Sequence, residues 1–384
     1  MNARMPGPLA GVKVIELAGI GPGPFCGMML ADMGAEILRV DRGGDVRPPT
    51  NGPRADILAR GRRSIGVDLK HKDGIETVLR LVEKADVIYE GFRPGVVERL
   101  GLGPDVCLAR NPRVVFGRMT GWGQDGPLAT AAGHDINYIA MTGALHAIGR
   151  KGERPVPPLN LVGDFGGGGL MLAFGIVCAL VERQRSGTGQ VVDAAMVDGA
   201  AALMAIIYGA QQQGWWTDER GVNMLDGGAH FYDTYETKDG KYVAIGSIEP
   251  QFYALLLQHT GLDKEELPHQ FDRGGWDAMH ERLTTVFKSK TRDEWCAIME
   301  GTDVCFAPVL TLSEAPRSAH AVARSAFRDV GGIVQPAPAP RFSRTPGDLG
   351  LPPSQAGEHT DAALADWGFT ADDIARLRGA NAIA

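Results

Sequence analysis

The sequence predicts an α/β fold in which a large, Rossmann-like domain with a parallel sheet is followed by a smaller α+β domain. Two observations carry this prediction. Over residues 1–200, short segments rich in Val and Ile alternate with segments of helical periodicity, the pattern of a parallel sheet covered on both faces. Later, Asp239-Gly240 separates two alternating segments, which is typical of an antiparallel hairpin. A chain of 384 residues is long enough for both domains.

The large domain is expected to span residues 1–200. Its predicted strands are short, and they fall at residues 12–17, 36–41, 64–69, 86–90, 114–116 and 190–197. The predicted helices lie at residues 25–33, 74–84, 164–185 and 198–208. In the second of these helices, apolar residues recur three and four positions apart, which places them on one helical face.

The rest of the chain is predicted to contain three parts. Residues 201–225 form a connector, and residues 226–330 form a small domain with hairpin strands at 232–236 and 241–245 and helical segments between 251 and 300. Residues 331–384 comprise a Pro-rich crossing segment and a C-terminal helix, near 371–378, that returns to the large domain. Proline disfavours helices and central strands, so the segment is expected to be extended and to cross over a partner subunit.

Composition excludes several classes of function. The net charge of −7 argues against a nucleic-acid-binding protein, which needs a basic surface. The five cysteines are scattered without a CxxC pair, so we expect free thiols and a cytoplasmic location. The histidines lack the spacing of a zinc site. No signal peptide is expected at the start, and the longest apolar stretch, residues 165–181, is shorter than a membrane span and is predicted to be a buried helix.

The loop at residues 19–24 follows a predicted strand and precedes a helix, where a dinucleotide-binding loop would lie. Asp41 also ends the next strand at about the expected distance. The glycine spacing does not match, however, because Pro24 or Cys26 occupies the third glycine position, and two prolines remove N–H groups. We therefore expect a tight turn at this loop rather than a nicotinamide or flavin site.

Two segments are candidates for the chemistry. His134 lies in Gly-His-Asp-Ile-Asn-Tyr, and Asp164 directly precedes Phe-Gly-Gly-Gly-Gly. Asp164 is placed to cap or begin a helix, whose free N–H groups suit a developing oxyanion, and the glycines suggest close approach of a bulky ligand. From the residues alone, two plainer interpretations stay open. Asp164 is also explained as an N-cap aspartate beside a glycine-lined helix contact, and His134 as a hydrogen-bonded structural histidine.

The motifs resemble the family III CoA-transferase superfamily and, within it, the racemases of 2-methylacyl-CoA thioesters. The resemblance covers nearly the whole chain, and it rests most on the segments at 9–14, 92–95, 133–138, 158–169, 223–228 and 248–253. It implies an interlocked homodimer. It also implies a racemase or epimerase that interconverts (R)- and (S)-2-methylacyl-CoA through an enolate, in fatty acid and sterol side-chain degradation.

Carried over residue by residue, the resemblance implies that His134 and Asp164 are the acid/base pair on opposite faces of the α-carbon. Glu249 would orient and polarise His134. It implies CoA contacts at Arg39, Val67, Asp68, Leu69, Lys70, Gly91, Phe92, Arg93, Arg99, Gly133, Asp135, Ile136, Asn137 and Tyr138. Arginine suits this role because guanidinium groups bind phosphates bidentately. His230 stands where the superfamily usually has proline and is expected near the acyl pocket.

The implied partners are an acyl-CoA substrate and a second copy of the chain, with no nucleic acid and no membrane. No metal or redox cofactor is expected, since CoA is part of the substrate. The alternative is a family III CoA-transferase in which Asp164 is the nucleophile and forms a mixed anhydride. A non-catalytic acyl-CoA-binding protein is a second alternative. The acyl chain stays open. Candidates for a Met-rich surface that adapts to many shapes are Met141, Met171, Met196, Met204 and Met224, most of which are expected to be core residues.

Overall fold

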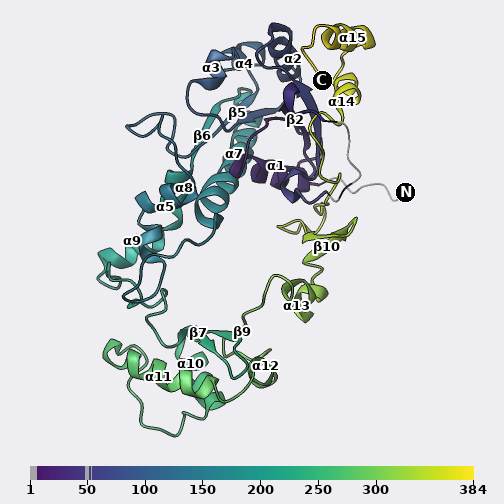
Figure 1. Ribbon diagram of the computed structural model, residues 1–384. Helices are drawn as coiled ribbons and strands as arrows, with labels where there is room; N and C mark the ends of the chain where they lie inside the picture. The colour runs from purple at the N-terminus through teal and green to yellow at the C-terminus, as the bar shows by residue number, and fades with distance from the viewer. Residues whose placement is uncertain (1–6, 48–51, 53) are drawn as a thin grey trace. The chain divides into compact units, whose positions relative to one another are not determined.

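A computed structural model describes residues 7–47, 52 and 54–384 and divides the chain into two compact units (Figure 1). Unit 1 contains residues up to 142, residues 159–203 and residues 319–384, and unit 2 contains residues 143–158 and 204–318. The stretch 143–158 thus belongs with unit 2, and residues 319–330 belong with unit 1, whereas the sequence assigned them to the large and small domains respectively.

Unit 1 is built on a six-stranded sheet with the order β3-β2-β1-β4-β5-β6, in which every pair of neighbours is parallel. Its strands are β1 (Lys13–Leu17), β2 (Glu36–Arg42), β3 (Arg62–Val67), β4 (Val87–Glu90), β5 (Val115–Thr120) and β6 (Val191–Ala195). The Rossmann-like parallel sheet predicted from the sequence is confirmed. The order reverses between β1 and β4, the position where open α/β sheets bind ligands.

Helices cover both faces of this sheet, because successive strand residues point to opposite sides. Val14 of β1 packs in a core with α1 (Pro22–Asp32) and α7 (Leu170–Ser186). Ile15, the next residue, packs in a second core with α2 (Lys72–Val82), α14 (Thr360–Asp366) and α15 (Ala371–Gly379). Figure 1 shows the two groups of helices on opposite sides of the sheet.

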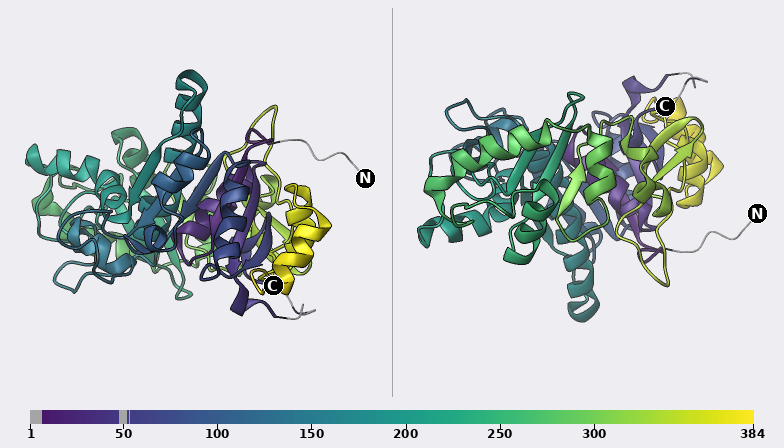
Figure 2. Two further views of the ribbon diagram at one scale, coloured as in Figure 1. Left: turned by 90° about the horizontal axis from the view of Figure 1, so that it is seen from above. Right: turned by 90° about the horizontal axis from the view of Figure 1, so that it is seen from below.

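The C-terminal residues close one edge of the sheet. Asp68 N–H donates to the carbonyl of Ala382, and Ala384 N–H donates to the carbonyl of Gly66. Both views of Figure 2 show the C-terminal helices (yellow) beside the N-terminal strands (purple). The return of the C-terminal helix to the large unit is therefore observed. The small helices α3 (Val96–Arg99), α4 (Pro104–Arg110), α5 (Asp135–Met141) and α13 (Ala319–Ala323) and the hairpin of β10 (Phe327–Val330) and β11 (Ile333–Pro336) complete unit 1.

The Pro-rich segment makes its described contacts within unit 1. The guanidinium of Arg60 donates to Gln335 Oε1 at 2.9 Å and to the carbonyl of Pro336 at 2.8 Å. Farther along, Gly61 N–H donates to Leu351 and Asp348 N–H donates to Asp32, both at carbonyl oxygens. The segment is thus fastened along α1 and the start of β3, and its predicted crossing over a partner stays a prediction.

The helix predicted at residues 164–185 begins earlier and changes form. Residues 161–169 form a π-helix, η3 (Leu161–Gly169), in which Phe165 N–H donates to the carbonyl of Asn160, and α7 continues from residue 170. Wide turns of this kind occur frequently at functional sites. Asp164 therefore lies within the first turn of η3 and does not cap a helix.

The glycines of η3 meet neighbouring helices. A Cβ at Gly167 would lie 2.6 Å from the backbone nitrogen of Ala200 in α8 (Met196–Leu203), and one at Gly169 would lie 2.5 Å from the carbonyl oxygen of Pro22 in α1. Close helix packing thus accounts for these glycines. The expectation that these glycines admit a bulky ligand is wrong at Gly167 and Gly169, because α8 and α1 occupy that space, while the expected oxyanion site stays a prediction.

By length and composition alone, the helical run Leu161–Ser186 could cross a membrane, and 44% of its most apolar 18 residues are buried in unit 1. Leu172 and Ile176 pack beneath the sheet as core residues. Leu170, Phe174 and Val181 are exposed, so the stretch predicted to be a buried helix is buried on one face only.

Unit 2 contains the predicted antiparallel hairpin. β7 (Tyr232–Glu236) pairs with β8 (Tyr242–Gly246), and β8 also pairs with β9 (Phe306–Pro308). The helices of this unit are α6 (Ala144–Ala147), α9 (Ala205–Gln212), α10 (Pro250–Thr260), α11 (Trp276–Phe287) and α12 (Arg292–Met299). The helix predicted at 198–208 is in fact two, α8 in unit 1 and α9 in unit 2, which separate at Met204.

Candidate active site

A cavity of about 670 Å³ opens in unit 1 at the carboxyl ends of the central strands. Its lining includes Gly19–Gly23 after β1, Gly91–Pro94 after β4 and Thr120–Trp122 at the end of β5. β1 and β4 flank the point where the strand order reverses, so the cavity lies where parallel α/β sheets bind ligands. His134 and Asp164, which are far apart in the sequence, both line it.

His134 lies at the N-cap of α5 and is exposed to the cavity. Its backbone is extended, and its N–H donates to Asn137 Oδ1 at 3.0 Å, which fixes the start of the helix. Tyr138 holds the preceding residue, because its hydroxyl donates to the carbonyl of Gly133 at 2.5 Å. A Cβ at Gly133 would lie 2.7 Å from the Tyr138 ring, so glycine is required there. These contacts fix the backbone that carries the His134 imidazole.

Asp164 is half-buried and enters the cavity from η3. Its Oδ2 accepts from Asn160 Nδ2 at 3.2 Å, and its backbone N–H donates to Asp135 Oδ2 at 2.7 Å. Burial raises the pKa of the Asp164 carboxyl, and the charge of Asp135 raises it further, while Asn160 and His134 act in the opposite direction. This carboxyl is therefore more easily protonated than an ordinary aspartate.

Apolar and aromatic side chains complete the cavity wall. Met119, Trp122 and Met196 line it, and Trp122 stacks edge-on against Tyr138 with ring centroids 4.8 Å apart. Met196 belongs to the predicted methionine surface, whereas Met119 and Trp122 were missed. Their signal in the sequence is their place at the end of a parallel strand, where ligand-contacting residues gather.

The loop after β4 is held by a buried carboxyl. Glu90 Oε2 accepts from the N–H of Phe92 at 2.6 Å, and Glu90 Oε1 accepts from Arg118 Nε at 3.2 Å. Burial raises the pKa of Glu90 to about 7, against the opposing effects of that N–H and of Arg118. Glu90 thereby fixes the segment that brings Arg93 to the cavity, and sequence analysis did not identify it.

The predicted CoA-contact residues separate into two groups. Gly91, Phe92, Arg93, Gly133, Asn137 and Tyr138 line the cavity. Arg39, Val67, Asp68, Leu69, Lys70, Arg99, Asp135 and Ile136 do not line it.

Two members of the second group already have intramolecular partners. Arg39 forms an ion pair with Asp41 at 2.7 Å, and Asp135 is buried with its carboxylate against Asp164. The CoA contacts implied for Arg39 and Asp135 stay predictions.

Glu249 belongs to unit 2, where it is the N-cap of α10 ahead of Pro250. Its charge raises the pKa of the nearby Cys305 thiol, an effect second to burial. The structure thus brings His134 and Asp164 together in unit 1 and describes Glu249 separately in unit 2.

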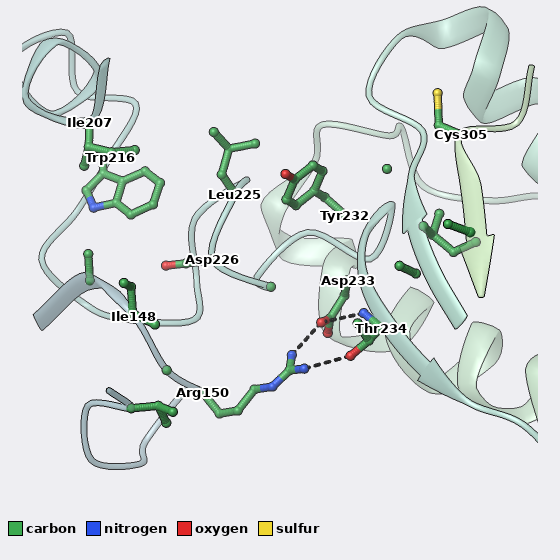
Figure 3. A pocket seen from close by; sticks show the side chains of 18 of the residues that line it. Ile148, Arg150, Ile207, Trp216, Leu225, Asp226, Tyr232, Asp233, Thr234 and Cys305 are labelled. Carbon is green, nitrogen blue, oxygen red and sulfur yellow. Dashed lines mark hydrogen bonds and ion pairs between the residues drawn. The ribbon is translucent and has the colours of Figure 1, made fainter. Parts of the chain in front are cut away.

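Unit 2 has a cavity of its own, of about 770 Å³, lined mostly by apolar residues (Figure 3). The guanidinium of Arg150 points at β7 and donates to Asp233 Oδ1 at 2.5 Å and to Thr234 Oγ1 at 3.0 Å (Figure 3). Met204 is part of the lining.

His230 is not among the residues that line this cavity. Its side chain is 1% exposed, its Nε2 lies 2.9 Å from the Tyr253 hydroxyl, and burial lowers its pKa to about 4. His230 is thus a neutral core residue of unit 2.

The model of CoA-transferase family III matches residues 9–360. The chain is 50% identical to mouse α-methylacyl-CoA racemase and 46% identical to the human racemase of that name, with 96% of each chain covered in both cases. Among solved structures, a CAIB/BAIF family protein from Brucella suis matches with a TM-score of 0.82 and 27% identity, covering 94% of this chain and 100% of that one.

Proposed function

Because this chain belongs to CoA-transferase family III, we propose that it is a racemase that interconverts (R)- and (S)-2-methylacyl-CoA thioesters. The observation that carries the proposal is the pairing of His134 and Asp164 in one cavity, on separate elements. Racemisation requires one group to remove the α-proton and another to return a proton on the opposite face. Similarity to the mouse and human racemases over nearly the full chain supports the same activity.

In one direction, neutral His134 accepts the α-proton of the thioester, and the electron pair of the C–H bond delocalises into the carbonyl to form an enolate. Protonated Asp164 then delivers its proton to the other face of the α-carbon, and the carbonyl is restored. In the reverse direction, ionised Asp164 is the base and protonated His134 is the acid. One proton leaves and one returns in each turnover, so the pair ends in its other protonation state and relaxes before the next cycle.

The environment of Asp164 suits both roles. A carboxyl in water at neutral pH is almost fully ionised and is a poor acid catalyst. Burial and the charge of Asp135 raise the pKa of Asp164, which increases the protonated fraction. Asn160 donates to the same carboxyl and limits that increase. The group can therefore alternate between acid and base.

The loop residues and arginine of the cavity bind the thioester. Arg93 follows the fixed residues Gly91 and Phe92 and supplies a cation for a CoA phosphate. Met119 and Met196 offer an adaptable apolar surface to the acyl group. The reaction needs no metal and no redox cofactor, since the CoA moiety belongs to the substrate.

The proposal extends to assembly and location. Glu249 polarises His134 when the active form assembles, as the family resemblance implies, and the active form is an interlocked homodimer in the cytoplasm. Exposed apolar residues of α7 support a subunit contact: Leu170, Phe174 and Val181 are 46%, 66% and 51% exposed. Light scattering after size-exclusion chromatography measures the mass, and a species at twice the 40.9 kDa chain mass is expected.

The deciding experiment is α-hydrogen exchange. The protein is incubated in D2O with one enantiomer of a 2-methylacyl-CoA and no acceptor acid, and deuterium content and chirality at C2 are followed. We expect deuterium to enter as chirality is lost. An unlabelled, unchanged thioester that passes its CoA to an added carboxylic acid would instead identify Asp164 as a nucleophile and the protein as a CoA-transferase.

A further inference from the structure

We propose that Asp135 is a positioning residue for Asp164, which fixes the backbone of Asp164 by a hydrogen bond and places a second negative charge beside its carboxyl. The inference rests on the proposed racemase function. It assigns Asp135 a role different from the CoA contact expected from the sequence.

The side chain of Asp135 is directed away from solvent and toward η3. It is 6% exposed, and its Oδ2 accepts from the backbone N–H of Asp164 at 2.7 Å. The N–H groups of a first helical turn have no partner within the helix, so an acceptor from elsewhere is needed. Asp135 supplies it across 29 residues of sequence.

Gly163 makes this approach possible. A Cβ on Gly163 would lie 2.5 Å from Asp135 Oδ2, closer than a real Cβ comes to a neighbouring heavy atom. Glycine beside Asp164 therefore admits the Asp135 carboxylate, which is a specific reason for that glycine. The second carboxylate oxygen, Oδ1, is buried without a hydrogen-bond partner among the described residues. Holding a carboxylate in this way costs free energy, which indicates a use beyond capping.

Asp135 also couples the two catalytic residues. It follows His134 directly and is the first residue of α5, so its backbone moves with the N-cap at His134. Its side chain meanwhile holds the backbone of Asp164. One residue thus determines the separation between the base on one face of the substrate and the acid on the other. Misplacement of about 1 Å in such a pair can reduce turnover about 100-fold.

The charges around Asp164 leave Asp135 as the group that favours its protonated form. Asn160 and His134 favour the ionised form of Asp164. Burial and the charge of Asp164 raise the pKa of the Tyr138 hydroxyl, and Arg93 lowers it. Other elements packed on η3 are α1, α7, α8, β5 and β6. Asp32 on α1 is paired with Arg60, and Arg183 on α7 is paired with Asp86. On β5 and β6, Arg118 and Asp193 interact with one another. Asp198 on α8 is exposed.

The test is the pH profile of kcat/KM for one enantiomer, measured by α-hydrogen exchange. Asp135→Asn keeps an oxygen that accepts from Asp164 N–H and removes the charge. A pair of acid/base groups gives a bell-shaped pH profile whose two limbs report the apparent pKa values of the pair as a whole. Removal of a nearby negative charge lowers both apparent pKa values. Both limbs are expected to move to lower pH, by about one unit. The control is Asp198→Asn, which removes an exposed carboxylate from α8, a helix that also packs against η3. This variant is expected to leave the pH profile unchanged.

Asp135→Ala removes the hydrogen bond as well and is expected to lower kcat at its own optimum by about 10- to 100-fold, with a smaller change in KM. Limbs of Asp135→Asn that coincide with those of the wild type would overturn the inference while the wild-type exchange still supports the racemase. A wild type without exchange would overturn the proposed function itself. A direct titration of the Asp164 carboxyl by 13C NMR, assigned with Asp164→Asn, gives the same comparison without turnover.

Discussion

Two parts of unit 1 bury carboxylates in different ways. Beneath the sheet, Glu16 meets Arg62 at 2.5 Å and Asp32 meets Arg60 at 2.6 Å, with every one of these side chains at most 3% exposed. At η3, Asp164 has no arginine partner among the described residues, and the charges that act on its pKa are those of Asp135 and His134. Burial raises the pKa of both Asp32 and Asp164, but Arg60 opposes that rise at Asp32, whereas the charge of Asp135 adds to it at Asp164.

The difference follows from what each place must do. Arg60 donates from two nitrogens to Asp32 and from another to the carbonyl of Pro336, so it joins α1 to the Pro-rich segment. Buried atoms without a hydrogen-bond partner occur in both regions, at Arg62 Nε and Nη2 beside Glu16 and at Asp135 Oδ1 beside Asp164. The two regions therefore differ in the sign of the charge placed against the buried carboxylate.

The comparison is tested most strongly by removing the proton-transfer groups. His134→Ala and Asp164→Asn are each expected to lower racemisation at least about 100- to 10,000-fold, because each removes one of two obligatory acid/base groups. Loss of chirality of a single enantiomer, followed by circular dichroism or chiral chromatography, measures the effect. Retention of more than a tenth of wild-type activity by either variant would remove that residue from the mechanism.

At the buried Asp32–Arg60 ion pair, Arg60→Met leaves Asp32 without its cation. We expect the free energy of unfolding of unit 1 to fall by about 3–5 kcal/mol. The double variant Arg60→Met/Asp32→Leu removes both charges and is expected to recover most of the loss. Urea denaturation of the three proteins measures this. Equal stability of the single and double variants would mean that the charge of Asp32 is not what destabilises Arg60→Met.

Gly21, in the loop after β1, lies beside the carboxyl of Asp164. Its φ is +68°, and a Cβ there would lie 3.2 Å from Asp164 Oδ2. Gly21→Ala is expected to cost about 1–2 kcal/mol of stability through the left-handed backbone and to reduce kcat by displacing the carboxyl. Gly11→Ala is the matched control, since its φ is +87°, a Cβ there would meet nothing within 4 Å, and Gly11 does not line the cavity. Thermal unfolding and kcat of both variants are compared, and identical behaviour would contradict this account.

The smallest effect is expected at Glu90, whose charge is only partly offset by Arg118. Its folded pKa, about 7, lies above its ordinary value, so its stabilising contribution is complete at low pH and is lost as pH rises through about 7. Glu90→Gln should therefore gain about 1 kcal/mol relative to the wild type at pH 8. The gain should vanish as pH falls toward 4.5. Melting temperatures across this range measure it, and a gain that grows at low pH would show that the sign is wrong.

The sequence by itself determined the parallel sheet, the hairpin of unit 2 and the pairing of His134 with Asp164. The strands follow from local composition, because a buried parallel strand needs a short run of β-branched residues wherever it lies. The hairpin follows from Asp239-Gly240, since few dipeptides adopt that turn. His134 and Asp164 were identified through motifs long enough to be specific, although their local patterns alone allowed purely structural roles.

Only the tertiary structure decided what surrounds those residues. The glycines of η3 suggested a ligand, and packing against α1 and α8 filled the space instead. Asp41 accepts from Arg39 Nε, and the carboxylate of Asp135 accepts from the backbone N–H of Asp164, and the sequence predicted neither contact. Local sequence sets the backbone preference of a segment, but the partner of a buried charge is chosen by whichever distant segment packs against it, and no spacing rule records that choice.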